Sequence, residues 1–161
     1  MEQLTIRPIA ESDDARIAAI IRRNLEAAGL NIPGTAYYDE ALDRLSAYYA
    51  VDSMRRYFVL TDGMRTLGGA GFEKLAGIPD CAELQKLYLC EEAKGQGLGE
   101  RLLRYVEARA AEAGFRRLYL ETHSCLDRAL RLYARMGYRE IPRPAFVQHG
   151  TMDRFYLKDL L

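Results

Sequence analysis

The sequence contains no tryptophan, only two histidines and no apolar run long enough to span a membrane. Its 23 basic residues balance its 23 acidic ones, and no long basic stripe indicates nucleic acid as a partner. The three cysteines, Cys81, Cys90 and Cys125, are odd in number and lack the spacing of metal ligands. They fit a protein of the reducing cytoplasm, and we expect no metal, no membrane and no nucleic acid among its partners.

The length and the first residues bound the organisation of the chain. With 161 residues it has the length of one domain, and we interpret residues 1–161 as a single domain with a sizeable core. The first residues, M-E-Q-L-T-I-R-P, lack the apolar segment of a signal peptide. Composition therefore favours a globular cytoplasmic domain and leaves its activity open.

The segment Cys81–Tyr105 combines the features of a strand, a glycine-rich loop and a helix. In its first part apolar residues alternate with polar ones, at Ala82, Leu84, Leu87 and Leu89. One extra residue interrupts the alternation between Leu84 and Leu87, which is how a β-bulge is expected to look in sequence. Because a bulge turns backbone groups toward a site, we expect functional backbone atoms on this strand.

A glycine-rich loop, K-G-Q-G-L-G over residues 94–99, follows the strand and leads at once into a helical pattern. Apolar residues recur one turn apart in that helix, at Leu98, Leu102, Val106 and Ala110. So little side chain lets several backbone N–H groups point into one concavity, where the helix adds its own N–H groups and its positive dipole end. The segment predicts a site for a phosphate or diphosphate, with a merely tight connection as the alternative.

Two spaced motifs indicate which phosphate-bearing ligand this is. The dinucleotide fingerprint would need a small residue at Leu102, and the P-loop pattern is absent. Instead, Lys94-x-x-Gly97-x-Gly99 resembles motif A of the GNAT superfamily of N-acetyltransferases, R/Q-x-x-G-x-G/A, with Lys in place of Arg or Gln. Downstream, the segment Ala129–Tyr138 resembles motif B of that family, A-x-x-L-Y-x-x-x-G-F/Y. Motif B lies one helix and one strand beyond motif A, as in the family.

The resemblance implies an α/β (α+β) fold, in which a mixed, mostly antiparallel, twisted sheet is flanked by helices. We expect about six to seven strands and about four helices, with a parallel central pair splayed apart. The strands are expected at residues 4–8, 56–61, 66–74, 82–89, 117–122, 138–141 and 152–157. Helices are expected to begin at caps formed by Ser12, by Asp39 and by the capping box Ser124-x-x-Asp127.

By the same resemblance the chain is an acetyl-CoA-dependent N-acetyltransferase that passes the acetyl group directly to a primary amine in a ternary complex. The backbone of three strand residues, Leu87, Tyr88 and Leu89, is expected to pair with the pantetheine arm. The diphosphate is expected at the loop and first helical turn, comprising Lys94, Gly95, Gln96, Gly97, Leu98, Gly99 and Glu100. Leu126 stands where many members have Asn, so a frequent hydrogen bond to the pantetheine arm is missing.

Two side chains are candidates for the chemistry. The resemblance implies that Tyr133 donates a proton to the departing thiolate, and the alternative is a core aromatic on an apolar helix face. Glu83 is the carboxylate on the central strand and our candidate general base, acting directly or through a water. The alternatives for Glu83 are a solvated carboxylate or an ion-pair partner, and Glu121 on the next strand is the rival base.

The acceptor is the part that the sequence specifies least. We expect it to be set by loops around residues 30–40 and 142–150, which carry Tyr37, Tyr38, Phe146 and His149. Balanced charge and short aromatic loops favour a small amine or amino acid over a protein or peptide amine. A non-catalytic acyl-CoA-binding module and a nucleotide-binding enzyme stay open as alternatives, and so does a homodimer.

Overall fold

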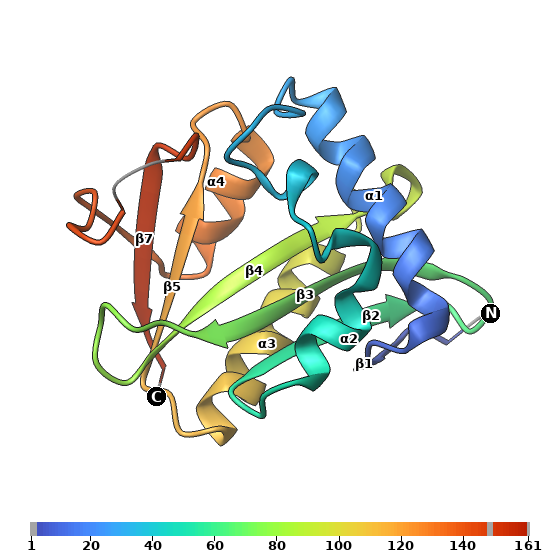
Figure 1. Ribbon diagram of the computed structural model, residues 1–161, viewed down its shortest axis with the longest axis horizontal. Coiled ribbons are helices and arrows are strands. Elements are labelled where there is room, and N and C mark those ends of the chain that lie inside the picture. The colour runs from blue at the N-terminus through green and yellow to red at the C-terminus, as the bar shows by residue number, and fades with distance from the viewer. Residues whose placement is uncertain (1–2, 148–149, 161) are drawn as a thin grey trace.

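The computed structural model describes residues 3–147 and 150–160, which form a seven-stranded sheet in the order β1-β2-β3-β4-β5-β7-β6 (Figure 1). The strands are β1 (Thr5–Pro8), β2 (Arg55–Thr61), β3 (Thr66–Lys74), β4 (Cys81–Leu89), β5 (Arg117–Thr122), β6 (Arg139–Ile141) and β7 (Arg154–Asp159). β4 and β5 run parallel, and the other neighbouring strands run antiparallel. The mixed sheet with a central parallel pair, expected from the sequence, is confirmed.

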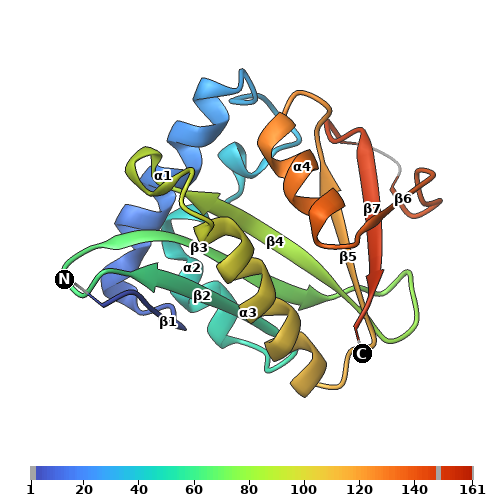
Figure 2. The same cartoon turned by 180° about the vertical axis from the view of Figure 1, so that it is seen from behind.

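In the part of the chain that the structure describes, four α-helices cover the two faces of this sheet. They are α1 (Asp14–Ala27), α2 (Leu45–Ala50), α3 (Leu98–Glu112) and α4 (Asp127–Arg135). α1 and α2 lie over one face, seen in front in Figure 1, and α3 and α4 lie over the other, seen in front in Figure 2. The molecule therefore has three layers, and each face of the sheet contributes to a separate part of the core.

Alternation along the strands assigns side chains to these two core regions. On β2, Phe58 and Leu60 pack with α3 and α4, whereas Tyr57 and Val59 pack with α1 and α2. The expected apolar stripe of α3 is confirmed, because Leu98, Leu102, Val106 and Ala110 are all buried in the first region. Alternate residues of the strand are buried on opposite faces of the sheet, and every fourth residue of the helix is buried against one face. These two patterns determine which element packs on which face.

The parallel pair is registered over only a short stretch. β4 and β5 pair from Cys81 with Arg117 to Glu83 with Tyr119, and no further pairs join them. β5 then continues beside β7, while β4 continues beside β3. The two central strands consequently separate beyond Glu83, as Figure 2 shows, and a cleft opens between them.

Three expected helix caps are wrong, and the side chains of Asp39 and Ser124 have other partners. α1 begins at Asp14, after a 3₁₀ turn that contains Ser12. The Asp39 carboxylate lies 2.7 Å from Lys86 Nζ, and α2 begins only at Leu45. The backbone N–H and hydroxyl of Ser124 both donate to the Asp153 carboxylate at 2.8 Å, so no capping box forms.

The start of α1 is anchored by a buried carboxylate. Asp13 accepts hydrogen bonds from Arg7 at 2.7 Å, from Thr66 at 2.7 Å and from the backbone N–H of Ala10 at 2.8 Å. Burial alone would raise the pKa of Asp13, but these bonds lower it to about 2. The charged group ties β1, β3 and α1 together at neutral pH.

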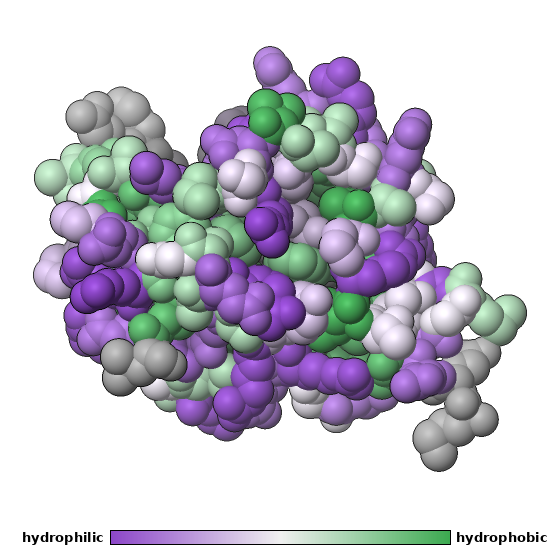
Figure 3. Space-filling model, turned by 90° about the horizontal axis from the view of Figure 1, so that it is seen from below, coloured by the Kyte–Doolittle hydropathy of each residue, from purple (hydrophilic) through white to green (hydrophobic). Residues whose placement is uncertain are grey.

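The surface mixes polar and apolar side chains. Seen from below, apolar residues form several small groups among hydrophilic ones (Figure 3). Val51 and Met64 are exposed singly on the molecule, which is normal for surface residues. Within residues 3–147 and 150–160, no helix combines the length and the apolar character that crossing a membrane requires.

Candidate functional site

The cleft between the separated strands has a volume of about 740 Å³. Its walls come from β4, the loop after it, the start of α3, the end of β5 and one side of α4, with the end of α1 at one rim. Most of the residues assigned to a ligand from the sequence line it, namely Leu87, Tyr88, Leu89, Lys94, Gly95, Gly97, Leu98, Gly99, Glu100 and Tyr133. Residues far apart in the sequence thus meet at one hollow.

Backbone conformation explains the glycines of the loop. Gly95 and Gly97 have φ values of 77° and 76°, in the left-handed region that glycine adopts without strain. Gly97 is the N-cap residue of α3, so no side chain covers the free N–H groups of the first turn. At Gly99 a side chain would meet only Leu132 and Leu89, at 3.5 and 3.9 Å. The loop therefore presents bare amides and a helix N-terminus to the cleft, as an anion site requires.

The side chains of the loop have different roles. Lys94 lines the cleft, and its Nζ lies 3.0 Å from a carboxylate oxygen of Glu91. Gln96 is exposed and its amide donates to the carbonyl of Glu92 at 2.8 Å, so its side chain closes the loop. Glu100 also lines the cleft, and its carboxylate accepts from Arg104 at 2.9 Å. The backbone, more than the side chains, makes this end of the site.

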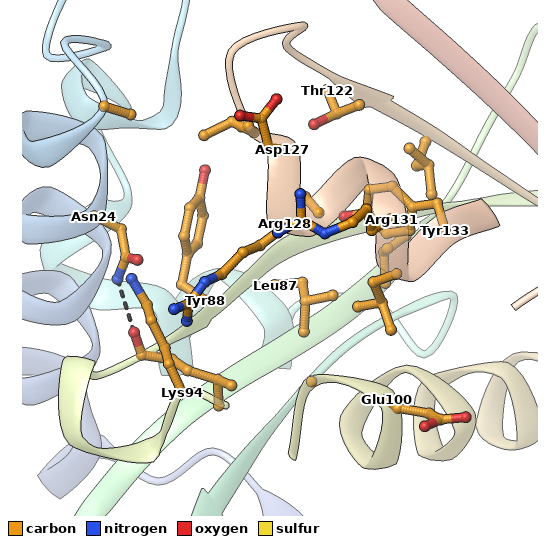
Figure 4. A pocket seen from close by; sticks show the side chains of 18 of the residues that line it. Asn24, Leu87, Tyr88, Lys94, Glu100, Thr122, Asp127, Arg128, Arg131 and Tyr133 are labelled. Carbon is orange, nitrogen blue, oxygen red and sulfur yellow. Dashed lines mark hydrogen bonds between the residues drawn. The ribbon is translucent and has the colours of Figure 1, made fainter. Parts of the chain in front are cut away.

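Positive charge on α4 faces the same cleft. Arg128, Arg131 and Arg135 line it at a spacing of three and four residues, which places them on one side of the helix. Figure 4 shows the side chains of Arg128 and Arg131 reaching from α4 across the hollow. These arginines were not predicted from the sequence, although their helical spacing is visible there. Together with Lys94 they make the cleft attractive to a ligand with several negative charges.

The β-bulge expected in β4 is confirmed. Gln85 pairs with Gly71 and Tyr88 pairs with Gly69, so Lys86 and Leu87 together face the single residue Ala70. Lys86 has a φ of 53°, which is unusual for a residue with a side chain. The bulge lies at the wall of the cleft, and it changes the direction of the backbone there.

The edge of β4 beyond the bulge borders the cleft without a β5 partner in the described part of the chain. Such an edge offers N–H and C=O groups to an extended ligand, as a strand does to an added strand. Asn24 of α1 donates to the carbonyl of Leu89 at 2.9 Å, shown as a dashed line in Figure 4. It also donates to Ile20 at 2.8 Å, so the end of β4 is fixed to α1. Asn24 was not identified from the sequence.

Tyr133 lies on the side of α4 that faces the sheet. Its side chain is buried, contacts the rings of Tyr138 and Tyr156, and lines the cleft. Burial, and then the neighbouring phenol of Tyr88, raise its pKa above the usual value of 10. Tyr133 is therefore both a core aromatic and a protonated phenol at the edge of the hollow.

Glu83 lies at the closed end of the cleft, in the last registered pair of the parallel strands. Burial raises its pKa to about 7, and the charges of Glu121 and Glu73 add to the shift. A hydrogen bond of 3.0 Å from Gln85 opposes it by favouring the charged form. The cleft-lining residues include Glu121 but not Glu83. Glu83 therefore lies outside the lining of the cleft, at the point where the two strands part.

A polar network surrounds Glu83 on the face covered by α2. Gln85 donates to both Glu83 and Glu73, at 3.0 and 3.1 Å, and accepts from the Tyr49 hydroxyl at 2.6 Å. Glu73 also accepts from the Tyr48 hydroxyl, at 2.8 and 2.9 Å. On β5 the Tyr119 hydroxyl donates to Glu121 at 2.9 Å. The carboxylates are thereby held in fixed positions around the point where the strands part.

The two loops expected to set the acceptor approach one another. Thr151 donates to the carbonyl of Pro33 at 2.8 Å, which joins the loop after α1 to the loop before β7. Phe146 packs edge-on against Tyr119, with ring centroids 5.6 Å apart, and occupies the space beside Gly77. Phe146 thus lies beside β5, and the loop before β7 is joined to the loop after α1. His149 lies outside the described residues.

Comparisons with known proteins agree with this geometry. The sequence profile described as the acetyltransferase (GNAT) family matches residues 22–138. The chain is 33% identical over 138 residues to the Escherichia coli K12 protein named uncharacterized N-acetyltransferase YjgM, covering 84% of this chain and 82% of that one.

Solved structures share the fold. A GNAT-family acetyltransferase from Staphylococcus aureus Mu50 superposes with a TM-score of 0.83 at 20% identity, over 99% of this chain and 100% of that one. YncA from Salmonella typhimurium, solved with acetyl-CoA, gives a TM-score of 0.74 at 22% identity, over 98% and 94%. At these identities the likeness concerns the arrangement of strands and helices.

Proposed function

The chain belongs to the GNAT acetyltransferase family, and from that premise we propose that it transfers an acetyl group from acetyl-CoA to the primary amine of a small molecule. The observation that carries the proposal is the parting of β4 and β5 between a bare-amide loop and an arginine-bearing helix. This arrangement fits a long ligand with an anionic end and an amide-containing arm. The Salmonella relative of the same fold was solved with acetyl-CoA, which supports the choice.

In this proposal the anionic end of acetyl-CoA lies against the loop of residues 94–99 and the first turn of α3. Backbone amides there carry no covering side chain, and Lys94, Arg128 and Arg131 add positive charge. The pantetheine arm then follows the unpaired edge of β4, where the backbone of Leu87, Tyr88 and Leu89 supplies hydrogen bonds. This placement brings the thioester to the bulge, near Tyr133.

The chemistry we propose is direct aminolysis of the thioester. The nitrogen of a neutral amine attacks the acetyl carbonyl, and the oxyanion that forms accepts a hydrogen bond from a backbone N–H at the bulge. The C–S bond then breaks, and the phenol of Tyr133 gives its proton to the departing thiolate. Because burial keeps this phenol protonated, it is in the correct form throughout the working pH range.

The amine must lose a proton during the reaction, and we assign that proton to Glu83, directly or through a water. A general base works best when its pKa lies near the operating pH, and the pKa of Glu83 is about 7. Glu121 lines the cleft and is the competing assignment. The two assignments differ in position, because Glu121 lines the cleft, whereas Glu83 lies in the network with Gln85 on the face covered by α2.

A thiol-release assay tests the proposal. Acetyl-CoA is incubated with the protein and a panel of small amines, amino acids and amine-terminated peptides, and the free thiol is measured with and without each acceptor. Thiol release that depends on a small amine supports the proposal. Release only with peptides favours a protein or peptide acceptor, whereas saturable CoA binding without acceptor-dependent release would show a non-catalytic binding module.

A further inference from the structure

Tyr57 is a fully buried tyrosine of β2 whose ring lies across the neighbouring strand β3. A side chain at Gly69 would come within 2.5 Å of the Tyr57 ring, and one at Gly71 would come within 2.7 Å of it. Both glycines therefore leave room for this ring, which accounts for glycines inside a strand that they otherwise weaken. No role for Tyr57 was predicted from the sequence.

The Tyr57 hydroxyl reaches across β3 to the bulge of β4. It donates a hydrogen bond of 2.7 Å to the carbonyl of Lys86. Lys86 is the bulge residue with positive φ, and it faces Ala70 together with Leu87. Because the bulge disrupts the regular ladder with β3, the tyrosine hydroxyl supplies a partner for this partly buried carbonyl.

The side chain of the same bulge residue is held independently. Lys86 Nζ lies 2.7 Å from the carboxylate of Asp39, in the loop between α1 and α2. The Lys86 side chain is 16% exposed, so this pair is partly shielded from water. The bulge is thus fixed at its carbonyl by Tyr57 and at its side chain by Asp39.

We propose that Tyr57 is a positioning residue for acetyl transfer, which fixes the Lys86–Leu87 peptide so that the N–H of Leu87 is directed into the cleft. This inference rests on the proposed function, because the amide matters only if an oxyanion forms there. Burial raises the pKa of Tyr57 well above 10, so the hydroxyl remains a donor at every working pH. An oxyanion donor that is displaced by a fraction of an ångström loses much of its effect.

The test compares Tyr57→Phe with the wild type and with Tyr138→Phe. The first variant keeps the ring between Gly69 and Gly71 and removes only the hydroxyl. Tyr138→Phe is the matched control, because it also removes a buried hydroxyl, one that donates to Glu107 at 2.6 Å away from the bulge. For each protein we would measure the turnover number, the KM for acetyl-CoA and the exchange rates of backbone amides by NMR.

We expect Tyr57→Phe to lower the turnover number by about 10- to 100-fold, with the KM for acetyl-CoA changing less than about threefold. Amide exchange should accelerate at residues 86–88 and stay unchanged in α1. The control should lose stability and keep its turnover number. An unchanged turnover number, or a reduced one without any change at the bulge amides, would overturn the inference.

The two proposals fail in different ways. If no amine produces thiol release with the wild type, acetyl transfer is wrong, and the positioning role that depends on it is wrong as well. If the wild type is active and Tyr57→Phe matches the control in turnover number and amide exchange, only the role of Tyr57 is overturned.

Discussion

Glu83 of β4 lies directly opposite Tyr119 of β5, and this is the last registered pair before the parallel strands separate. A carboxylate thus lies at the point where the cleft begins, at a depth at which burial raises its pKa to about 7. Tyr119 donates to Glu121, so a second carboxylate is fixed two residues further along β5. The site consequently has two carboxylates whose roles can be separated by experiment.

Substitution of Glu83 by Gln should change the pH dependence of catalysis. If Glu83 is the base, kcat/KM of the wild type rises with pH and levels off above an apparent pKa of about 7. Glu83→Gln should lower kcat/KM by about 10²- to 10⁴-fold and remove this step from the profile. The measurement is kcat/KM for the best amine, taken between about pH 5 and pH 9.

The matched variant is Glu121→Gln, on the neighbouring strand. If Glu83 is the base, Glu121→Gln keeps the step near pH 7, displaced slightly to lower pH, since the charge of Glu121 contributes to the raised pKa of Glu83. A profile that loses its step in Glu121→Gln and keeps it in Glu83→Gln would assign the base to Glu121.

Glu83→Gln should also stabilise the folded protein at neutral and alkaline pH. A carboxyl with a pKa of 4.5 when unfolded and about 7 when folded binds its proton more tightly in the folded state. Its ionisation therefore costs stability, on the order of 3 kcal/mol once the pH exceeds the folded pKa, and nothing below the unfolded one. In Glu83→Gln the side-chain oxygen still accepts the hydrogen bond from Gln85. The amide does not ionise, so this cost disappears.

The check is the free energy of unfolding in urea at about pH 8 and about pH 4.5. We expect the variant to be more stable than the wild type at the higher pH, with the difference shrinking toward zero at the lower one. A variant that is less stable at both values would show that burial does not raise the pKa of Glu83.

Tyr133→Phe should separate the proton donor from the core aromatic. The phenylalanine ring keeps the contacts with Tyr138 and Tyr156 but cannot protonate a thiolate. We expect the turnover number to fall by about 10²-fold or more, as for other general acids, while the dissociation constant for CoA stays within about twofold. Thiol release at saturating substrates and calorimetry with CoA measure the two quantities. An unchanged turnover number would leave Tyr133 a packing residue.

Much of the fold could be predicted because the signals are local. The extra residue between Leu84 and Leu87 predicts the bulge, and the structure has it at Lys86 and Leu87. The glycines at 95 and 97 predict a loop without side-chain cover, and both have positive φ. A strand, a loop, a helix and a further strand predict a parallel pair, and β4 and β5 form it. Each of these features depends on consecutive elements of the chain between Cys81 and Thr122.

The features that the sequence did not reveal depend on contacts between distant segments. Ser12, Asp39 and Ser124 have the composition of helix caps, but Asp39 pairs with Lys86, and Ser124 binds Asp153. In the sequence, Asn24 is one polar residue of an amphipathic helix. Only the structure shows that it donates a hydrogen bond to the end of β4. A pattern along one element cannot show which partner a polar side chain meets across the fold.

Gly97→Ala should weaken CoA binding through the backbone. Alanine at a φ of 76° is strained, by about 1–2 kcal/mol, although nothing lies within 4 Å of the added methyl group. Relief of that strain moves the backbone amides that start α3. We expect the loss of about one hydrogen bond to the charged group of CoA, which lowers the affinity for CoA about tenfold. Gly114→Ala, at a φ of 101° beyond the other end of α3, is the control.

Calorimetry with CoA and urea unfolding distinguish the two glycine variants. Both should lose similar stability, because each forces a side chain into the left-handed region. Only Gly97→Ala should bind CoA more weakly. Equal CoA affinity for the two variants would mean that the amides of residues 95–99 do not contact the ligand.

Arg131→Glu tests the electrostatic contribution of α4. The arginine lines the cleft and is exposed, so charge reversal there should repel an anionic ligand without disturbing the core. Arg116→Glu is the matched control, since it changes the net charge equally, from +0 to about −2, at an exposed position outside the cleft lining. We expect Arg131→Glu to weaken CoA binding about tenfold at low salt and Arg116→Glu less than about twofold.

Salt dependence supplies the second readout for the arginine. Interactions between exposed charges are screened over about 10 Å at 0.1 M salt and over about 3 Å at 1 M. The difference between the variants should therefore narrow as salt is raised, because it arises from charge and not from a lost contact surface. If the two variants weaken binding equally, the net charge of the protein attracts CoA and the arginines of α4 have no special place in the site. If Arg131→Glu weakens CoA binding by the same factor at every salt concentration, the arginine side chain contributes to binding by packing instead.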